Sequence, residues 1–435
     1  MLIVISVLLA GALGWNEPDS ESLKYWGQWR GPLGTGVAPQ GDPPSQWSES
    51  KNIRWKINLP GEGNGTPVVW GDRIYLTAAI PTGRKPENAP SSAGGSMSRP
   101  PQSIYQFIVL AIDRTNGKEV WRRMVREEYP HEGCHPDNTM APHSPATNGE
   151  HVLAWFGSRG LYCLDMNGNV LWEKDFGDQK MRGGFGEGGA VGLHDGVVVV
   201  NWDHEGDSMA VALDEKTGKE LWRDRHDEAT SWSSPTFVEV NGKAQVILSA
   251  PNFIRCFDLH SGALVWKASG MTPNTVPSPV VEGNLAIVMS GFRGSALLAI
   301  KYKEAHGDIS SGSAIAWKHS GDTPYVPSPL LYRNHLYFYS LNKAVLSCMN
   351  AQTGDHFFET QRLEGVNGSI YASPVGAGDK VYLAARDGTV SVIRLSDDFQ
   401  LIARNKLDDG FDASPVIVGK ELILRGNEHL YCIAE

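Results

Sequence analysis

The side chains with the most obvious chemistry gather in one loop of the sequence. Histidine and cysteine bind zinc and related metals, and His131, Cys134, His135 and His143 lie close together along the chain. Their spacing matches no standard zinc pattern, and one Cys before His does not make the C-x-x-C-H motif of haem attachment. Two interpretations stay open: a metal site built from these four residues, or a polar loop over a larger opening.

A second cluster combines a histidine with carboxylates. The run N-W-D-H-E-G-D contains Trp202, Asp203, His204 and Glu205, and it interrupts two apolar stretches. So many charged and polar groups cost free energy unless water or a partner satisfies them. The cluster is therefore either a functional site or a hydrated turn between two strands.

Both clusters must be positioned by a repeat that fills the rest of the chain. From Ala210 to Trp222 the sequence reads A-V-A-L-D-E-K-T-G-K-E-L-W. Apolar alternation predicts a half-buried strand, Asp and Gly predict a tight turn, and the Trp begins the return strand. Degenerate copies occur at Ala111/Asp113/Gly117/Trp121, Cys163/Asp165/Gly168/Trp172, Cys256/Asp258/Gly262/Trp266 and Cys348/Asn350/Gly354/Phe358, with weaker ones at Ala299/Trp317 and Val392/Ile402.

A short apolar strand containing proline precedes these copies. Its Ser-Pro or Thr-Pro pair begins at Thr66, Ser144, Ser234, Ser278, Ser328, Ser373 and Ser414, and Ala190-Val191 holds the equivalent place without proline. A period of roughly 45 residues with four short strands per unit is typical of a β-propeller. The last copy stops at Glu435 without its final strand, and residues 52–57 supply a matching one. We therefore expect an all-β fold: an eight-bladed propeller of four-stranded antiparallel blades, closed by an N-terminal strand.

The A-x-D-x-x-T-G-x-x-x-W repeat resembles that of the pyrroloquinoline-quinone (PQQ) propellers. That superfamily includes quinoprotein alcohol dehydrogenases and the propeller lipoprotein of the outer-membrane β-barrel assembly machinery. The stretches W-G-Q-W-R-G-P at residues 26–32, N-W-D-H-E-G at 201–206 and A-T-S-W-S at 229–233 further resemble bacterial PQQ-like repeat proteins that are frequent in planctomycetes. The resemblance covers nearly the whole chain after about residue 25. It implies the fold more strongly than an activity, because one fold hosts many functions.

The propeller fold places a further set of residues together. The first strand of each blade lines the central channel, so the residues just before the Ser-Pro pairs converge on one mouth. The expected set is Asn64, Trp232, Tyr325, Tyr371 and Asp412, with Glu187 nearby and Arg293 adding a cation to the rim. With Trp202, Asp203, His204 and Glu205, these are the candidate ligand-binding residues. Aromatic rings and carboxylates around a funnel suit a small-ligand pocket, and a water-filled channel is the alternative.

The resemblance implies one enzymatic function, a dehydrogenase that uses PQQ and calcium. Such chemistry needs carboxylate and amide oxygens for the metal and a general-base Asp. Asp203, Glu205 and Asp412 could supply carboxylates, but the adjacent Cys pair of the methanol-type enzymes is absent, and their catalytic Asp motif has no counterpart. We therefore expect an exported noncatalytic propeller that binds a protein, peptide or glycan through its face or channel. The PQQ dehydrogenase is the alternative, and metal-assisted hydrolysis by the His131–His143 loop is another.

Composition and the N-terminus bear on partners and location. The chain has 39 basic and 49 acidic residues, a formal net charge of -10, and no basic run, so no nucleic-acid partner is expected. Residues 1–14 are apolar and end in a small-residue cleavage motif, which predicts a signal peptide and a periplasmic or secreted protein. A short membrane anchor is an alternative, although about 20 apolar residues are needed to span a bilayer.

These features suggest a simple organisation of the chain. We expect a signal peptide at 1–14, an irregular arm at 15–50 and one propeller domain at 51–435. Four of the five cysteines share one repeat column with alanine, so we expect buried small side chains rather than disulfides. A closed ring needs no second copy, and we expect a monomer.

Overall fold

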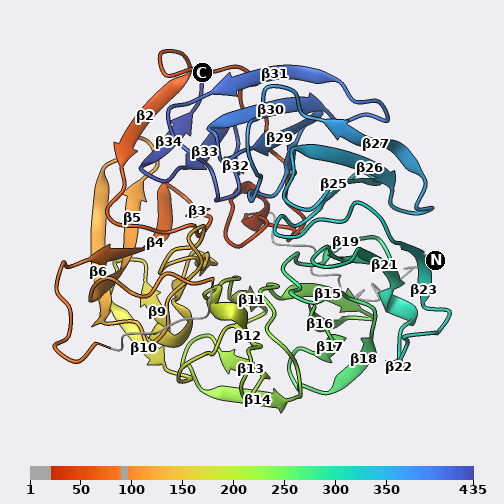
Figure 1. Ribbon diagram of the computed structural model, residues 1–435, viewed down its shortest axis with the longest axis horizontal. Coiled ribbons are helices and arrows are strands. Elements are labelled where there is room, and N and C mark those ends of the chain that lie inside the picture. Colours follow the sequence, from red (N-terminus) through yellow and green to blue (C-terminus); the bar gives the residue numbers. More distant parts are fainter. Residues whose placement is uncertain (1–20, 90–96) are drawn as a thin grey trace, which may run out of the picture.

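The computed structural model describes residues 21–89 and 97–435, and in these residues the chain forms an eight-bladed β-propeller (Figure 1). Blades 1 to 4 contain β3 (Val68–Trp70), β4 (Arg73–Pro81), β5 (Tyr105–Asp113) and β6 (Glu119–Glu128); β7 (Ala146–Thr147), β8 (His151–Trp155), β9 (Leu161–Asp165) and β10 (Val170–Lys174); β11 (Gly192–His194), β12 (Val197–Trp202), β13 (Met209–Asp214) and β14 (Glu220–Arg225); and β15 (Thr236–Val240), β16 (Lys243–Leu248), β17 (Ile254–Asp258) and β18 (Leu264–Ala268).

Blades 5 to 8 repeat this order. They contain β19 (Val280–Glu282), β20 (Leu285–Ser290), β21 (Ala296–Lys301) and β23 (Ile315–His319); β24 (Leu330–Tyr332), β25 (His335–Tyr339), β26 (Val345–Asn350) and β27 (His356–Arg362); β28 (Val375–Ala377), β29 (Lys380–Ala384), β30 (Thr389–Arg394) and β31 (Leu401–Lys406); and β32 (Val416–Val418), β33 (Glu421–Arg425), β34 (His429–Ile433) and β2 (Ile53–Asn58). The predicted ring closure is confirmed, because the N-terminal β2 pairs antiparallel with β34 as the outer strand of the last blade.

Short elements complete the described chain. Two strands, β1 (Val37–Ala38) and β22 (Gly307–Asp308), add to β28 and β18 in parallel and were not predicted from the sequence. The short 3-10 helices are η1 (Ser22–Lys24), η2 (Gly157–Arg159), η3 (Arg182–Gly184) and η4 (Tyr302–Glu304). None of the helices in the described part has the length and hydropathy of a membrane span. The predicted signal peptide, 1–14, lies outside the described residues.

In five of the eight blades, the repeat's tryptophan donates a hydrogen bond to the next blade. In blade 3, Trp222 pairs across the strands with Ala212, whose small side chain leaves room for the ring. The indole covers the turn of the following blade, where a Cβ on Gly262 would lie 2.6 Å from Trp222. Its Nε1 donates a hydrogen bond of 2.7 Å to the Leu259 carbonyl in that turn. Equivalent indole hydrogen bonds join Trp55, Trp121, Trp172 and Trp317 to their neighbouring blades.

The cysteine column obeys the same rule. Cys163, Cys256 and Cys432 face Trp172, Trp266 and Trp55 across their strands, and Cys348 faces Phe358. All five cysteines are free and buried, which confirms the prediction for the four in the repeat column. For the weak copy Val392/Ile402, the predicted partner is wrong by one residue. A bulge in the strand pair places Ala403, rather than Ile402, opposite Val392.

The Ser-Pro pairs form a ring of hydrogen bonds around the channel. Except at Ser144, the backbone N–H donates to the hydroxyl of the corresponding residue in the next blade, for example Ser234 to Ser278 at 3.0 Å and Ser278 to Ser328 at 2.9 Å. The ring closes between the last and first blades, where the Ser414 N–H donates to Thr66 Oγ1 at 3.1 Å. Ala190, which lacks a hydroxyl, interrupts the ring, although its own N–H donates to Ser234. The ring holds the inner strands at a common height.

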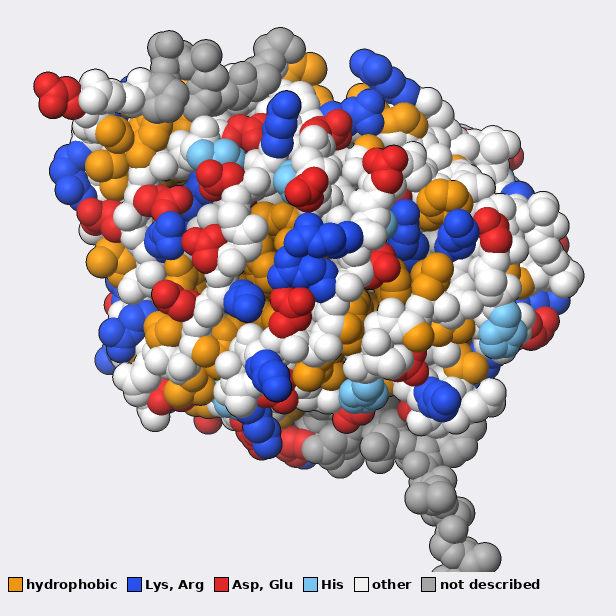
Figure 2. Space-filling model, turned by 90° about the horizontal axis from the view of Figure 1, so that it is seen from below, with side chains coloured by type: hydrophobic (Ala, Val, Ile, Leu, Met, Phe, Trp, Pro, Cys, Tyr) orange, Lys and Arg blue, Asp and Glu red, His pale blue; other side chains and the backbone are white. Residues whose placement is uncertain are grey.

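The outer surface differs in character from the channel. Figure 2 shows one side of the ring, where acidic and basic side chains are interspersed and hydrophobic side chains are scattered among them. This face carries no continuous field of one charge sign. The described residues that line the main concave site lie at the mouth of the central channel instead.

Candidate functional site

The N-terminal arm enters the central channel and closes it. Figure 1 shows the first described residues, in red, at the centre of the ring, from where the chain continues outward to β2. Trp29 donates its indole N–H to Ser278 Oγ at 3.3 Å, and the buried Arg30 donates to the carbonyls of Pro374 at 2.9 Å and Pro329 at 2.7 Å. Burial lowers the pKa of Arg30 to about 9. The part of the arm around Trp29 and Arg30 thus lies in the channel, whereas Trp47 reaches the outer strand β31, where its N–H donates to Asn405 Oδ1 at 2.8 Å.

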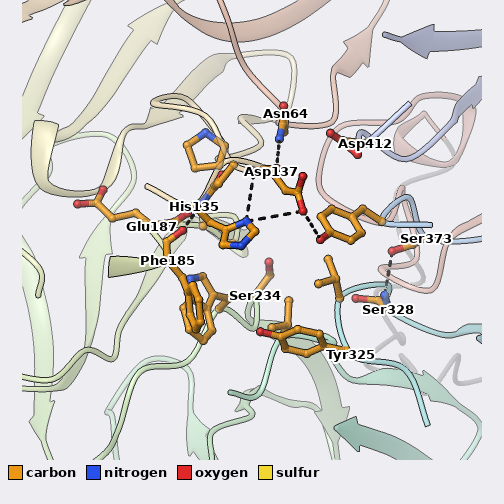
Figure 3. A pocket seen from close by; sticks show the side chains of 18 of the residues that line it. Asn64, His135, Asp137, Phe185, Glu187, Ser234, Tyr325, Ser328, Ser373 and Asp412 are labelled. Atoms are coloured by element: carbon orange, nitrogen blue, oxygen red, sulfur yellow. Dashed lines mark hydrogen bonds and ion pairs between the residues drawn. The ribbon is translucent and has the colours of Figure 1, made fainter. Parts of the chain in front are cut away.

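Above Trp29 the channel widens into a cavity of about 340 Å³, which we call the cup (Figure 3). Its floor is Trp29 and the Ser-Pro ring. Its walls come from the residues before the inner strands and from two loops that cover the mouth. The walls are aromatic at Phe185, Trp232, Phe292, Tyr325 and Tyr371, and polar at Asn64, His135, Asp137, Asn138, Glu187 and Asp412.

One side of the cup is an acidic network. Asp137 accepts a hydrogen bond from the Tyr371 hydroxyl at 2.9 Å, and its other oxygen lies 3.0 Å from Arg386 Nη1. Arg386 also lies 2.7 Å from Asp412 and stacks over the Tyr371 ring at 4.6 Å. Burial raises the pKa of Asp412, against the effect of Arg386. At Asp137, burial acts in the same direction but the hydrogen bonds from Arg386 and Tyr371 outweigh it, so its pKa is lowered.

The opposite side is aromatic. Trp232 is held by a hydrogen bond of 2.9 Å from its indole N–H to the Gly186 carbonyl, and it lies 6.5 Å from the Phe185 ring. Phe292 stacks on Tyr325 with ring centroids 4.9 Å apart. Aromatic faces fixed in this way offer apolar area and negative electrostatic potential to a ligand.

Six residues predicted for the channel mouth line the cup: Asn64, Glu187, Trp232, Tyr325, Tyr371 and Asp412. Glu187 lines it with its stem, because its carboxylate turns away to accept from the Ser158 N–H at 3.0 Å and the Ser158 hydroxyl at 2.5 Å (Figure 3). Arg293 does not reach the cup. It lies in a neighbouring groove, which shares Phe292 and Tyr325 with the cup.

The prediction that the Trp202–Glu205 cluster faces the channel mouth is wrong. Trp202 is buried against Trp155, with ring centroids 5.6 Å apart. Asp203 is buried and lies 2.8 Å from His226 Nε2. The two remaining members also bond within the fold: His204 Nδ1 accepts from the Lys180 N–H, and Glu205 accepts from the Thr230 N–H and hydroxyl. These side chains hold loops together, and partners distant in sequence satisfy them.

The metal-site hypothesis for His131, Cys134, His135 and His143 is also wrong. Within residues 21–89 and 97–435 there is no group of three or more His, Cys, Asp or Glu that could hold a metal ion. His131 accepts a hydrogen bond from Arg159, and burial raises the pKa of Cys134 to about 11, which keeps the thiol protonated. His143 is fully buried, and burial lowers its pKa to about 3. Of the four, only His135 lines the cup.

Several residues of the site were missed by sequence reasoning. Trp29 belongs to a stretch that was noted as a motif, but nothing in the sequence indicated that it enters the channel. Three further residues of the cup lie in loops beside predicted residues: Asp137, Phe185 and Phe292. Their closeness in sequence to the predicted site residues is the signal that could have identified them. Arg386 follows β29, the second strand of its blade, and no sequence pattern marks it.

The cup does not fit PQQ and calcium. PQQ is a flat tricarboxylic acid, and a site for it needs cations opposite its carboxylates. The described residues that line the cup include Asp137, Glu187 and Asp412 but no lysine or arginine. Arg386 lies behind them and is shared by two of the carboxylates. An anionic cofactor would therefore meet an acidic wall, and the carboxylates that could hold calcium are already paired.

Comparisons with known proteins agree with the fold. The crystal structure of BamB from Moraxella catarrhalis has a TM-score of 0.54 at 14% identity, over 83% of this chain and 98% of that one. The computationally designed Ika8 protein gives 0.56 at 13% identity, over 78% and 98%. A europium-containing methanol dehydrogenase gives 0.48 at 12% identity, over 95% and 99%. The first two likenesses show the fold alone, and no curated protein matches the sequence.

A family comparison goes further than the structural likenesses. The model described as outer membrane protein assembly factor BamB matches residues 106–360, which is more than half of the chain. The matched part runs from β5 to β27, so it contains the tryptophan repeats and most of the cup. The chain therefore belongs to this BamB family of PQQ-like propellers.

Proposed function

We propose that this protein is a noncatalytic propeller that binds a segment of a protein partner in the cup. The observation that carries the proposal is the cup itself: a concave, aromatic-walled site closed at its floor by Trp29. Large aromatic side chains in a concave site are the usual anchors of protein recognition. The family description as an assembly factor supports a binding role as well.

The state of the polar groups supports binding over catalysis. A general base must be free to reach the proton that it removes. Asp137 and Asp412 are both paired with Arg386, and the Glu187 carboxylate is directed at Ser158. Among the described carboxylates of the cup, none is therefore unpaired and directed into the cavity, as a general base would need to be.

We further propose that the protein acts as a monomer outside the cytoplasm, in the periplasm or secreted. The apolar residues 1–14 support export, and the family description names an assembly factor of outer membrane proteins. The ring closes on itself through β2, so its assembly needs no second copy.

A peptide selection tests the binding proposal. Random peptides displayed on phage are selected on the wild-type protein, and the enriched clones are measured against Trp232→Ala and Phe253→Ala. Phe253 is a matched control, because it is a partly buried aromatic outside the cup, where it packs against Arg255 and Lys267. We expect clones that lose binding to Trp232→Ala and keep it with Phe253→Ala.

Two other results would contradict the proposal. Failure to enrich peptides, together with retention of oligosaccharides in a glycan array, would replace the protein partner with a glycan. Saturable micromolar binding of PQQ in calorimetry, with or without calcium, would restore the dehydrogenase hypothesis. From the acidic lining we expect no binding of PQQ under either condition.

A further inference from the structure

Beside the cup lies a groove of about 750 Å³. It runs along the turn after β20, the turn between β25 and β26, and the loop after β27. Phe292 and Tyr325 line both the cup and the groove, so their stacked rings form a sill between the two. An extended ligand that enters the cup can therefore continue over the sill into the groove.

The groove has the opposite charge to the cup. Arg293, Lys343 and Arg362 line it and are exposed, and no carboxylate is among its described lining residues. None of the three has an ion-pair partner in the described part of the chain. The cup has the carboxylates of Asp137 and Asp412 against the guanidinium of Arg386, because the Glu187 carboxylate turns away to Ser158. Charge thus changes sign across the sill, from negative in the cup to positive in the groove.

The backbone of the groove provides an independent observation. Leu341 has φ of 55° and Arg293 has φ of 52°, in the left-handed region that residues other than glycine rarely adopt. Leu341 is also 37% exposed, although it is a large apolar residue. Its backbone hydrogen bonds to Thr323 and Tyr325 hold this conformation in place. Strained conformations that the surrounding structure maintains are frequent in ligand-binding sites.

We propose that the partner segment is an extended peptide of matching polarity, with a lysine or arginine in the cup and acidic residues along the groove. This inference rests on the proposed function and names the chemistry of the partner. The basic side chain lies against the Trp232 and Tyr325 faces, where cation–π attraction adds to the acidic potential of the wall. The acidic residues pair with Arg293 and Lys343, and Leu341 offers an apolar contact between them.

Four synthetic peptides test the polarity. They are blocked at both ends and identical except at two places: an arginine at one end and a pair of glutamates several residues away, each kept or replaced by glutamine. Fluorescence anisotropy measures their affinity for the wild-type protein. We expect the peptide with both charges to bind tightest and each neutral replacement to weaken binding by roughly fivefold, since such pairs are partly solvated.

Protein variants assign each charge to its place. Arg293→Gln with Lys343→Gln should abolish the preference for glutamate and keep the preference for arginine. Asp137→Asn should reduce the preference for arginine and leave the preference for glutamate unchanged. The melting temperature of this variant shows whether the fold persists. If the neutral peptide binds as tightly as the doubly charged one, or none of the four binds, the polarity proposal is overturned. The phage clones decide the proposed function separately, because their loss of binding to Trp232→Ala does not depend on charge.

Discussion

The repeat structure makes a prediction about two tryptophans that occupy the same position in successive blades. Trp222 is 8% exposed and donates to the Leu259 carbonyl at 2.7 Å, whereas Trp266 is 0% exposed and its indole nitrogen has no partner. Trp266 lacks a partner because the next blade replaces the Asp-Gly turn with η4. Burial alone would make Trp266 the costlier tryptophan to change.

Replacement by phenylalanine separates the hydrogen bond from the packing. Trp222→Phe leaves the Leu259 carbonyl without its donor, at a cost of about 1–3 kcal/mol, in addition to the lost ring volume. Trp266→Phe loses similar volume but also removes a buried, unsatisfied N–H. We therefore expect the free energy of unfolding to fall more in Trp222→Phe than in Trp266→Phe, by about 1–3 kcal/mol.

Equilibrium denaturation in urea measures this difference, with both variants compared to wild type by linear extrapolation. The matched positions cancel much of the error in the extrapolation. An equal loss in the two variants, or a larger loss in Trp266→Phe, would refute the view that indole hydrogen bonds fasten the blades.

Three further predictions concern stability. Although burial lowers it, hydrogen bonds to two aspartates raise the pKa of His226 to about 9, from an ordinary 6.5. The stabilisation of the fold by protonated His226 is therefore complete below pH 6.5 and is lost as pH rises through 9, and it is on the order of 2 kcal/mol. In urea denaturation, the free energy of unfolding of His226→Gln should therefore change less with pH between 6.5 and 9 than that of the wild type. Arg30→Met leaves carbonyls of the channel without donors and should cost about 2–4 kcal/mol in urea denaturation, so an unchanged midpoint would contradict the closing role of the arm. Gly262→Ala places a methyl group 2.6 Å from Trp222 and should destabilise by at least about 1 kcal/mol more than Gly242→Ala, which has a similar φ but open space, as thermal melts would show.

The fold could be predicted from the sequence because its determinants are local and repeated. A Trp, a small residue opposite it and a turn Gly recur in most blades, and each copy supports the reading of the others. The closing strand could be predicted because β34 has no outer neighbour within its own repeat. The path of Trp29 could not, since one arm without a repeat carries no periodic signal.

The candidate site was predicted where topology alone places a residue. Trp232 and Tyr325 reach the cup because they precede an inner strand. Asp203 was misplaced because its partner, His226, lies after β14, two strands further along the chain, and a sequence does not show which polar groups satisfy one another. His143 was misplaced for a related reason, since a histidine next to a Ser-Pro pair can be buried against Trp155 as readily as it can bind a metal.

Photo-crosslinking locates the bound segment and tests the central claim, which is that the cup is the binding site. A selected peptide that carries a benzophenone in place of one residue is irradiated with the wild-type protein, and the crosslinked residues are identified by mass spectrometry. We predict crosslinks to residues of the cup and sill, such as Met97, Trp232, Phe292 and Tyr325. Crosslinks confined to the outer strands β6, β10 and β14 would contradict the account, because they would place the partner on the rim of the ring and leave the cup without a ligand.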